Sequence, residues 1–362
     1  MKKNILLLVL FLSLISFIPK TKASTDTAYS YVLMDLYSGR VLKSKNKDTP
    51  LLIASITKIM TAIIAIENKD INDIVTVDES VKKSYGSGIY ISIGEEITLK
   101  DLLYGLMLRS GNDAAIMIST YISGSEESFV KLMNQKAKEI GMKNTIFYNS
   151  SGLDNNTKGN LSTAYDMALL TKYAMQNTTY KEIVKTKKYT TKTNLKTYIW
   201  HNKNKMLMYD YVTGGKTGYT EKAHRTLVST ASLDNMNLVV VTLNDSDDWN
   251  THTSLYNYAK ENYTSYKVLN KSKFKIEGDT YFKGKLVIKD DLYIPLKKEE
   301  TSSLINHIKL YKINNYKDNQ VVGESQIIYK NNILYSVPIY INKEEPKEKL
   351  SLIDKIKKWF ND

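Results

Sequence analysis

The sequence predicts a mixed α/β (α+β) domain with an antiparallel sheet and an inserted all-helical lobe, followed by a small all-β domain and a carboxy-terminal amphipathic helix. Three observations support this prediction. The chain has 362 residues, which is long for a single hydrophobic core. Helical and strand-like patterns alternate up to about residue 264, whereas short strand-like runs dominate residues 265–343. Residues 350–362 carry apolar side chains at helical spacing.

The amino-terminal segment has the layout of a secretory signal. Lys2 and Lys3 precede an apolar run over residues 5–18, and the small-residue stretch Thr21-Lys22-Ala23 follows. The apolar run is short for a membrane span, so we expect cleavage near Ala23 rather than retention as an anchor. Residues 1–23 are therefore assigned as a signal peptide, and the rest of the chain is expected to be exported.

Residues 24–264 are predicted to form the α+β domain. Helical periodicity or capping boxes indicate helices, and alternating or β-branched runs indicate strands. The predicted helices cover residues 55–66, 98–109 (with a break at 110–111), a third from 112, 126–140, 163–175 and 256–263. The predicted strands cover residues 29–34, 40–42, 216–219, 227–231 and 238–243.

Residues 265–343 are predicted to form the β domain, and residues 344–362 a linker and a terminal helix. The short strand-like runs cover residues 285–288, 292–296, 308–313, 326–329 and 334–340, with a hairpin turn at Asn331-Asn332. The terminal helix carries Trp359 and Phe360 among lysines, which is typical of helices that lie on an anionic membrane surface. The alternative is a helix packed on its own domain.

Composition excludes several classes of site. The chain has no cysteine and only 4 histidines, none in an H-x-x-x-H pair, so neither a metal nor another cofactor is expected. The formal charge is +13, or about +9 once the four lysines of the signal segment are subtracted. A basic surface suits nucleic acid, anionic lipid or anionic wall polymer. Nucleic acid is not expected, because no helix-turn-helix, zinc-finger or RNP-like pattern is present.

Three short motifs occur in order: Ser55-Ile56-Thr57-Lys58, Ser110-Gly111-Asn112 and Lys216-Thr217-Gly218. S-x-x-K starts at five serines in this lysine-rich chain, so the spacing alone means little. Ser55 differs from the other four because it opens an apolar helix predicted to be buried. A lysine buried there needs hydrogen-bond partners or loses its proton.

The first two motifs predict a nucleophile with its base. Ser55 and Lys58 share one helix face, and Lys58 becomes a base if burial and a second cation lower its pKa. Lys216 is the candidate for that cation. Ser110 is placed to pass the proton to a leaving amine, and Asn112 to hydrogen-bond Lys58 or the substrate.

The third motif predicts a binding strand. Lys216 and Thr217 would face a carboxylate of the substrate. The backbone N–H groups of Ser55 and Tyr219 are the candidate oxyanion hole. Together with the first two motifs, this describes a site for acyl transfer.

The chain resembles the low-molecular-mass penicillin-binding proteins, which are serine D-Ala-D-Ala carboxypeptidases with a β-lactamase-like fold. The resemblance is strong over residues 28–263 and rests on the layout of elements beyond them. It is carried by the phrases ASITKIMTA (54–62), DLLYGLM (101–107), SGNDAA (110–115), GLD (152–154), STAYDM (162–167) and GKTGYT (215–220).

The resemblance implies a complete assignment of roles. Ser55 would be the acylated nucleophile and Lys58 its base. Ser110 and Asn112 would form the second element, and Lys216-Thr217-Gly218 the third. The implied substrate is the peptidoglycan stem pentapeptide, β-lactam antibiotics would be covalent inhibitors, and no cofactor would be needed. The implied location is the outer face of the cytoplasmic membrane and the cell wall.

Two departures from the family pattern concern substrate binding. Members commonly have Ala-Gly after the K-T-G hairpin, whereas this chain has Ala223-His224. Many members also carry an arginine in the next strand that helps to bind the terminal carboxylate, and the matching place here looks like Asn237. Arg225 or Lys203 would then replace that arginine.

The sequence leaves two alternatives to a carboxypeptidase, a class A β-lactamase and a non-catalytic wall-binding protein. A class A β-lactamase needs a glutamate in an E-x-x-x-N loop between the second and third motifs, and none of the glutamates in that interval has an asparagine four residues later. A non-catalytic wall-binding protein would be favoured by loss of a motif residue, and none is lost. The balance between carboxypeptidase, transpeptidase and endopeptidase outcomes, and any role in sporulation, stay open.

Overall fold

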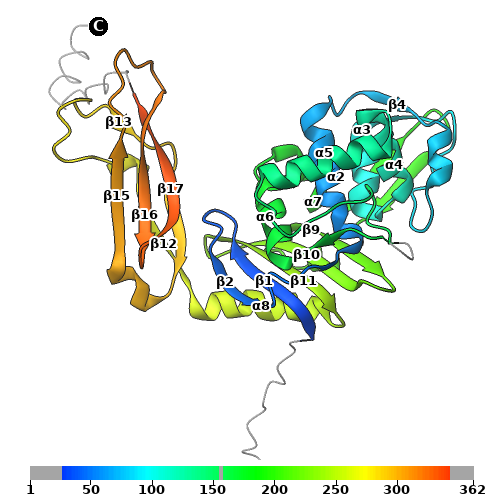
Figure 1. Ribbon diagram of the computed structural model, residues 1–362, viewed down its shortest axis with the longest axis horizontal. Coiled ribbons are helices and arrows are strands. Elements are labelled where there is room, and N and C mark those ends of the chain that lie inside the picture. Colours follow the sequence, from blue (N-terminus) through cyan, green and yellow to red (C-terminus); the bar gives the residue numbers. More distant parts are fainter. Residues whose placement is uncertain (1–26, 155–157, 343–362) are drawn as a thin grey trace, which may run out of the picture.

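The computed structural model describes residues 27–154 and 158–342. The signal segment, the linker and the terminal helix predicted above lie outside these residues. Figure 1 shows a compact mixed part and, beside it, an elongated part made of strands. Each helix in the described part of the chain is too short or too polar to cross a membrane.

A five-stranded antiparallel sheet forms the centre of the mixed part, in the order β2-β1-β11-β10-β9. Its strands are β1 (Ala28–Asp35), β2 (Val41–Lys45), β9 (Val212–Thr220), β10 (His224–Leu233) and β11 (Met236–Asp245). β11 is buried on both faces, since Val239 and Val241 face one hydrophobic cluster while Leu238 and Val240 face the other. This explains its nearly continuous apolar sequence.

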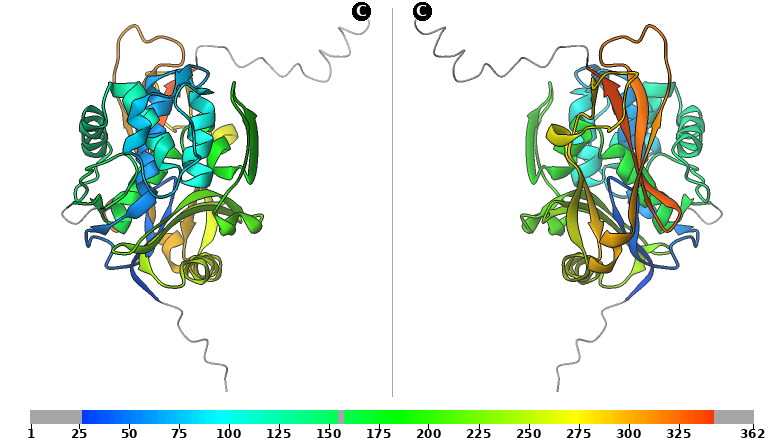
Figure 2. Two further views of the ribbon diagram at one scale, coloured as in Figure 1. Left: turned by 90° about the vertical axis from the view of Figure 1, so that its right-hand side faces the viewer. Right: turned by 90° about the vertical axis from the view of Figure 1, so that its left-hand side faces the viewer.

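Helices cover both faces of the sheet, as Figure 2 shows. One face carries the helical lobe and the other carries α8 (Asp248–Asn262). The lobe consists of α2 (Lys58–Asn68), α3 (Leu99–Tyr104), α4 (Asn112–Ser123), α5 (Glu126–Glu139), α6 (Ala164–Ala174) and α7 (Thr178–Lys185). The apolar helix α2 lies at its centre, in contact with α4, α5, α6 and α7.

The predicted caps at Thr98 and Thr163 are confirmed. The Thr98 hydroxyl accepts a hydrogen bond from the N–H of Asp101 at 3.0 Å, and the Thr163 hydroxyl accepts one from the N–H of Asp166 at 3.0 Å. α8, however, begins at Asp248, eight positions before the predicted start at 256. The first turns of α8 consist mostly of polar residues, so the apolar periodicity used for the prediction begins only near residue 256.

The β7 (Lys188–Lys192) and β8 (Thr197–His201) hairpin is a feature that the sequence patterns did not predict. β7 exposes two lysines and a threonine and has no apolar run, and β8 is short, with Ile199 exposed on its outer side. The hairpin is held by aromatic stacking, because the Tyr189 ring lies 3.6 Å from that of Tyr104 and 6.2 Å from that of Trp200. The remaining short pairs are β3 (Leu51–Leu52) with β6 (Leu161–Ser162), and β4 (Ile74–Thr76) with β5 (Glu96–Thr98).

The elongated part is all β and has its own hydrophobic core. One sheet pairs β12 (Thr264–Leu269) with β14 (Leu292–Leu296). The other contains β13 (Leu286–Val287), β17 (Asn332–Ile341), β16 (Val321–Tyr329) and β15 (Leu304–Leu310) in that order. β15 therefore lies earlier than the predicted strand at 308–313. The hairpin turn is centred on Lys330 and Asn331, both at positive φ, one residue before the predicted pair.

Arg40 joins the two parts. From the turn between β1 and β2, its guanidinium donates to the carbonyl of Pro295 at 2.9 Å and forms an ion pair of 2.5 Å with Glu300. The guanidinium also lies 5.6 Å from the ring centre of Tyr263. A second link runs from the Ser265 hydroxyl to a carbonyl of the β10–β11 turn at 3.1 Å.

Candidate active site

Ser55 lies on a short 3-10 turn, Ala54–Thr57, that leads directly into α2. The expected α-helical start is thus a tighter turn, with Ala54 at a φ of 47°, a conformation that is unfavourable for a residue with a side chain. Gly152 contacts this turn closely, since a Cβ on Gly152 would lie 1.9 Å from the Ala54 carbonyl oxygen. The backbone around Ser55 is therefore fixed by an opposing loop.

Lys58 is fully buried beneath Ser55. Its Nζ lies 3.1 Å from Ser55 Oγ, 2.7 Å from Asn112 Oδ1 and 2.5 Å from the carbonyl oxygen of Ser151. Burial lowers the pKa of Lys58 well below its ordinary value, and the positive charges of Lys216 and Lys203 lower it further, against the opposing effect of Asp113.

An ammonium group could donate to all three oxygens, and it is the lowered pKa of Lys58 that favours the neutral amine. A neutral Nζ has two hydrogens and one lone pair. The two oxygens of Asn112 and Ser151 are acceptors only, so they take the two hydrogens. The lone pair is then left for the Ser55 hydroxyl, which is the arrangement that removes a proton from the nucleophile. The amide of Asn112 is held in this orientation because its Nδ2 donates to the Tyr85 carbonyl at 2.6 Å.

Ser110 and Asn112 are brought to the site by an irregular helix end. A π turn, Gly105–Arg109, follows α3, and Ser110 then adopts a left-handed conformation with a φ of 63° before α4 begins at Asn112. The predicted break is confirmed, and it turns both side chains toward Lys58 and Lys216. π turns inside helices are frequent at functional sites.

Lys216 is 1% exposed on β9. Its Nζ donates to Ser110 Oγ at 3.1 Å and to the carbonyl of Thr217 at 2.7 Å. Burial, together with the charge of Lys203, lowers the pKa of Lys216 to about 7. The site thus contains two hydrogen-bonded groups, one of Ser55, Lys58 and Asn112 and one of Ser110 and Lys216, which meet where Ser110 and Asn112 lie two residues apart in the chain.

Gly218 allows β9 to approach the nucleophile. A Cβ at this position would lie 2.9 Å from the backbone nitrogen of Ser55 and 2.4 Å from the hydroxyl of Thr226 on β10. The Thr226 hydroxyl in turn donates to the carbonyl of Ile53 at 3.0 Å, which ties the sheet to the turn that carries Ser55. The predicted oxyanion donors, at Ser55 and Tyr219, therefore belong to segments in direct contact.

A cleft of about 380 Å³ opens above these residues. It is lined by Ser55, Ser87, Ser110, Lys203, Thr217, Gly218, Tyr219, Arg225, Asp248 and Trp249. Ser87, Asp248 and Trp249 were not predicted as site residues. Histidines and acidic residues within 27–154 and 158–342 do not gather in groups of three that suit a metal ion.

Arg225 and Lys203 line the cleft, whereas Asn237 does not. On β10, Arg225 pairs with Tyr219, and its Nε donates to Asp248 Oδ1 at 3.0 Å. On β11, Asn237 pairs with Ser232, at the opposite end of the same two strands. Asn237 was therefore a wrong match for an arginine that binds the substrate, because its end of the strand points away from Ser55.

His224 replaces the expected glycine in a left-handed backbone conformation, with a φ of 54°. This is the conformation that favours glycine, and histidine tolerates it better than most residues do. The side chain is exposed, so it does not crowd the strand beside Lys216.

Two known domain families match this chain. One described as D-alanyl-D-alanine carboxypeptidase matches residues 19–247, and one described as penicillin-binding protein 5, C-terminal domain, matches residues 263–347. Among curated proteins, D-alanyl-D-alanine carboxypeptidase DacF of Bacillus subtilis is 37% identical over 67% of this chain. DacC of Escherichia coli is 35% identical over 63% of it. The matches span 66% and 59% of the length of those relatives.

Solved structures show the same two-part layout. Penicillin-binding protein 5 of Haemophilus influenzae superposes with a TM-score of 0.69 at 27% identity, covering 87% of this chain and 96% of that one. D-alanyl-D-alanine carboxypeptidase DacD of Francisella tularensis gives a TM-score of 0.64 at 26% identity, covering 87% and 93%. Both likenesses extend through the β domain.

Proposed function

The chain belongs to the D-alanyl-D-alanine carboxypeptidase family, and on this premise we propose that it removes the terminal D-alanine from peptidoglycan stem pentapeptides. The observation that carries the proposal is the set of three contacts around Lys58 Nζ, two to acceptors and one to Ser55 Oγ. Together with the lowered pKa of Lys58, this set of contacts supports a serine nucleophile with a neutral lysine as its base.

In the proposed acylation, Ser55 Oγ attacks the carbonyl carbon of the penultimate D-alanine while Lys58 Nζ takes the hydroxyl proton. The N–H groups of Ser55 and Tyr219 stabilise the oxyanion. As the peptide bond breaks, the proton that Lys58 has taken passes by way of the Ser110 hydroxyl, which is hydrogen-bonded to Lys216, to the leaving amine, and Lys58 becomes neutral again. Water then hydrolyses the ester on Ser55, with Lys58 again as the base.

Thr217 and Lys216 would bind the terminal carboxylate, with Arg225 as an additional cation in the cleft. β-Lactams are proposed to acylate Ser55 and to stay bound, because the residues lining the cleft include no glutamate of the kind that a class A β-lactamase uses to deacylate. Intact motifs in mutual hydrogen bonding also disfavour a purely wall-binding role.

Ser55→Ala tests this function. We expect the wild-type protein to release D-alanine from a diacyl-Lys-D-Ala-D-Ala peptide and to be labelled by fluorescent penicillin, and the variant to do neither. Circular dichroism serves to show that the variant is folded, and Ser44→Ala, at another S-x-x-K, is the matched control. A penicilloyl group located by mass spectrometry on any other serine would disprove the assignment.

We further propose that the chain divides into a signal peptide (1–23), a catalytic domain (24–264), a β domain (265–343) and a membrane-associating tail (344–362). The apolar and basic pattern of residues 350–362 supports attachment to the outer face of an anionic cytoplasmic membrane. Deleting residues 350–362 should abolish co-sedimentation with anionic vesicles while turnover of soluble peptide stays unchanged. Equal sedimentation of both proteins would contradict this role.

A further inference from the structure

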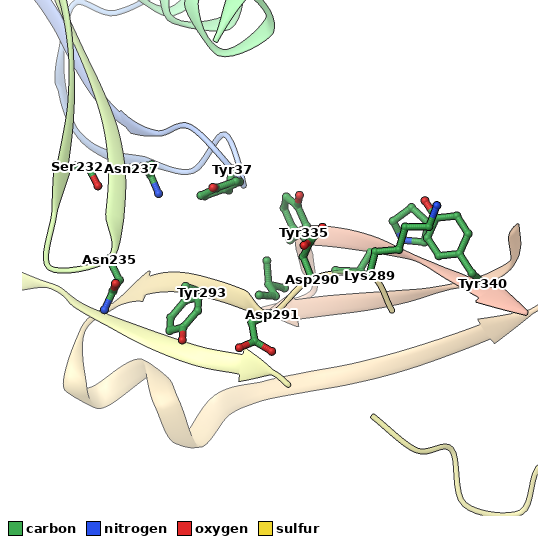
Figure 3. A pocket seen from close by; sticks show the side chains of 13 residues that line it. Tyr37, Ser232, Asn235, Asn237, Lys289, Asp290, Asp291, Tyr293, Tyr335 and Tyr340 are labelled. Carbon is green, nitrogen blue, oxygen red and sulfur yellow. The ribbon is translucent and has the colours of Figure 1, made fainter. Parts of the chain in front are cut away.

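A second groove, of about 650 Å³, lies where the two domains meet. Its catalytic-domain side is formed by the β1–β2 turn with Tyr37 and by the β10–β11 turn with Asn235 and Asn237. The β domain supplies Tyr293 and Tyr335. Figure 3 shows Tyr37 and Tyr335 on the two sides of the groove, one from each domain, with Tyr293 below them and the asparagines to one side.

Three tyrosine rings of this groove do not stack on other aromatic rings. Among the described residues, Tyr37, Tyr293 and Tyr335 take part in no ring–ring pair with one another or with other aromatic residues. The side chain of Tyr37 is 51% exposed. Exposed tyrosines offer a flat apolar face together with a hydroxyl, which suits ligands that are apolar on one side and polar at the edge.

Three charged side chains line the groove, those of Lys289, Asp290 and Asp291. Lys289 Nζ lies 4.1 Å from the ring centre of Tyr340. Asp291 forms an ion pair of 2.6 Å with Lys267 and accepts a hydrogen bond from the N–H of Lys271 at 2.8 Å. Asp291 is thus paired, and the remaining charges of Lys289 and Asp290 are opposite in sign, so the groove carries little net charge, which favours a neutral ligand over an ionic one.

The backbone carbonyls of the two asparagines in the groove accept hydrogen bonds. The carbonyl of Asn237 accepts a hydrogen bond from the N–H of Leu36 at 2.7 Å, and that of Asn235 accepts one from the hydroxyl of Ser265 at 3.1 Å. Each side-chain amide adds donors and an acceptor to the groove. Paired donors and acceptors beside flat rings match the hydroxyl and acetamido groups around a sugar ring.

We propose that this interdomain groove binds a glycan of N-acetylated sugars, in the manner of a second wall-binding site. The proposal deepens the proposed function, on which it rests, because the stem peptides of that substrate are carried on such a glycan. Thr226 beside the catalytic cleft and Ser232 beside the groove are six strand steps apart on β10, or roughly 20 Å. The glycan would therefore hold the polymer near the cleft without entering it.

The test uses the intact protein and a β-1,4-linked tetramer of N-acetylglucosamine, with binding measured by calorimetry. We expect a Kd on the order of 0.1–1 mM for the wild type, and binding weakened at least about tenfold by Tyr37→Ala or Asn237→Ala. Tyr29→Ala is the matched control, because Tyr29 is 48% exposed near the start of β1, the strand that leads into the turn with Tyr37, and does not line the groove. It should bind like the wild type.

Activity separates this proposal from the proposed function. All three variants should hydrolyse the small diacyl peptide like the wild type, whereas Tyr37→Ala and Asn237→Ala should raise KM for a glycan-linked substrate. If the wild type releases no D-alanine, the proposed carboxypeptidase function is wrong. The calorimetric binding of the tetramer would still show whether the groove binds a glycan. A wild type that binds no tetramer, or variants that bind it equally well, would overturn the groove assignment.

Discussion

Lys203 is the cation that the two buried lysines of the active site share. Its positive charge contributes to the lowered pKa of Lys58 and to that of Lys216, which is about 7. Lys203 itself is exposed and lines the cleft, with Nζ 3.5 Å from the hydroxyl of Ser87. It can therefore be replaced without opening the core.

Lys203→Met should raise the pKa of Lys58, because one of the charges that disfavour its protonation is removed. Lys58 then keeps its proton to higher pH, so acylation by penicillin should slow at neutral pH and recover in alkali. The acid limb of the profile of acylation rate against pH, measured from about pH 5 to about pH 9, should shift to higher pH. Lys203→Arg keeps the charge and should keep the limb in place. Coincident limbs for Lys203→Met and wild type would show that its charge does not tune the base.

The role of Arg225 can be tested by changing either Arg225 or its ion-pair partner Asp248. Asp248 is nearly buried and holds the guanidinium, whose side chain is 40% exposed. If Arg225 binds the substrate's carboxylate, Arg225→Ala should cost about 1–2 kcal/mol in kcat/KM for an acid-terminated peptide and less for its amide. Asp248→Asn should have the opposite effect, because it releases the arginine from its anion. If Arg225→Ala lowers kcat/KM equally for both peptides, Arg225 does not bind the carboxylate, and Lys203 is the next residue to test.

At the scale of elements, the hairpin between β9 and β10 carries a strained residue. His224 has a φ of 54° and an exposed side chain. His224→Gly should raise the free energy of unfolding by up to about 1 kcal/mol, because glycine adopts this conformation without a Cβ clash. His224→Ala keeps the clash and should give no gain. Urea midpoints provide the measurement, and equal midpoints for the two variants would contradict the strain.

The elements that the sequence predicted are those with a marked buried face or a cap. α2, β10 and β11 have such faces, whereas β7 is mostly polar and the hairpin that it forms with β8 depends on contacts with Tyr104 that no local pattern reveals. Motif spacing likewise identified Lys58 and Lys216. It did not identify the Ser151 carbonyl that contacts Lys58, since a backbone group has no residue-type signature.

The error at Asn237 has a different physical origin. Its strand was predicted correctly, but the end of the strand that faces the cleft depends on the antiparallel register, in which Thr226 pairs with Leu243 and Ser232 with Asn237. Position along a strand is thus a property of pairing, which a sequence alone leaves undetermined. The same register places Asn237 in the interdomain groove.

At the scale of the whole molecule, Arg40 fixes the relation between the domains, and with it the width of that groove. Its contacts with Pro295 and Glu300 come from a catalytic-domain turn only three residues after Tyr37. A groove with one wall in each domain is sensitive to any change in this joint. Binding of a ligand across both walls would in turn stabilise the arrangement that Arg40 holds.

The burial of Lys58 and Lys216 also makes folding a reaction that releases protons. An unfolded lysine holds its proton up to about its ordinary pKa of 10.5, whereas in the folded protein the pKa of Lys216 is about 7 and that of Lys58 is well below the ordinary value. Between these limits the unfolded state binds more protons, so stability should rise with pH. The calorimetric heat of unfolding near pH 8 should then depend on the ionisation enthalpy of the buffer. Lys58→Met should reduce that dependence, and an unchanged slope would show that Lys58 stays charged when the chain is folded.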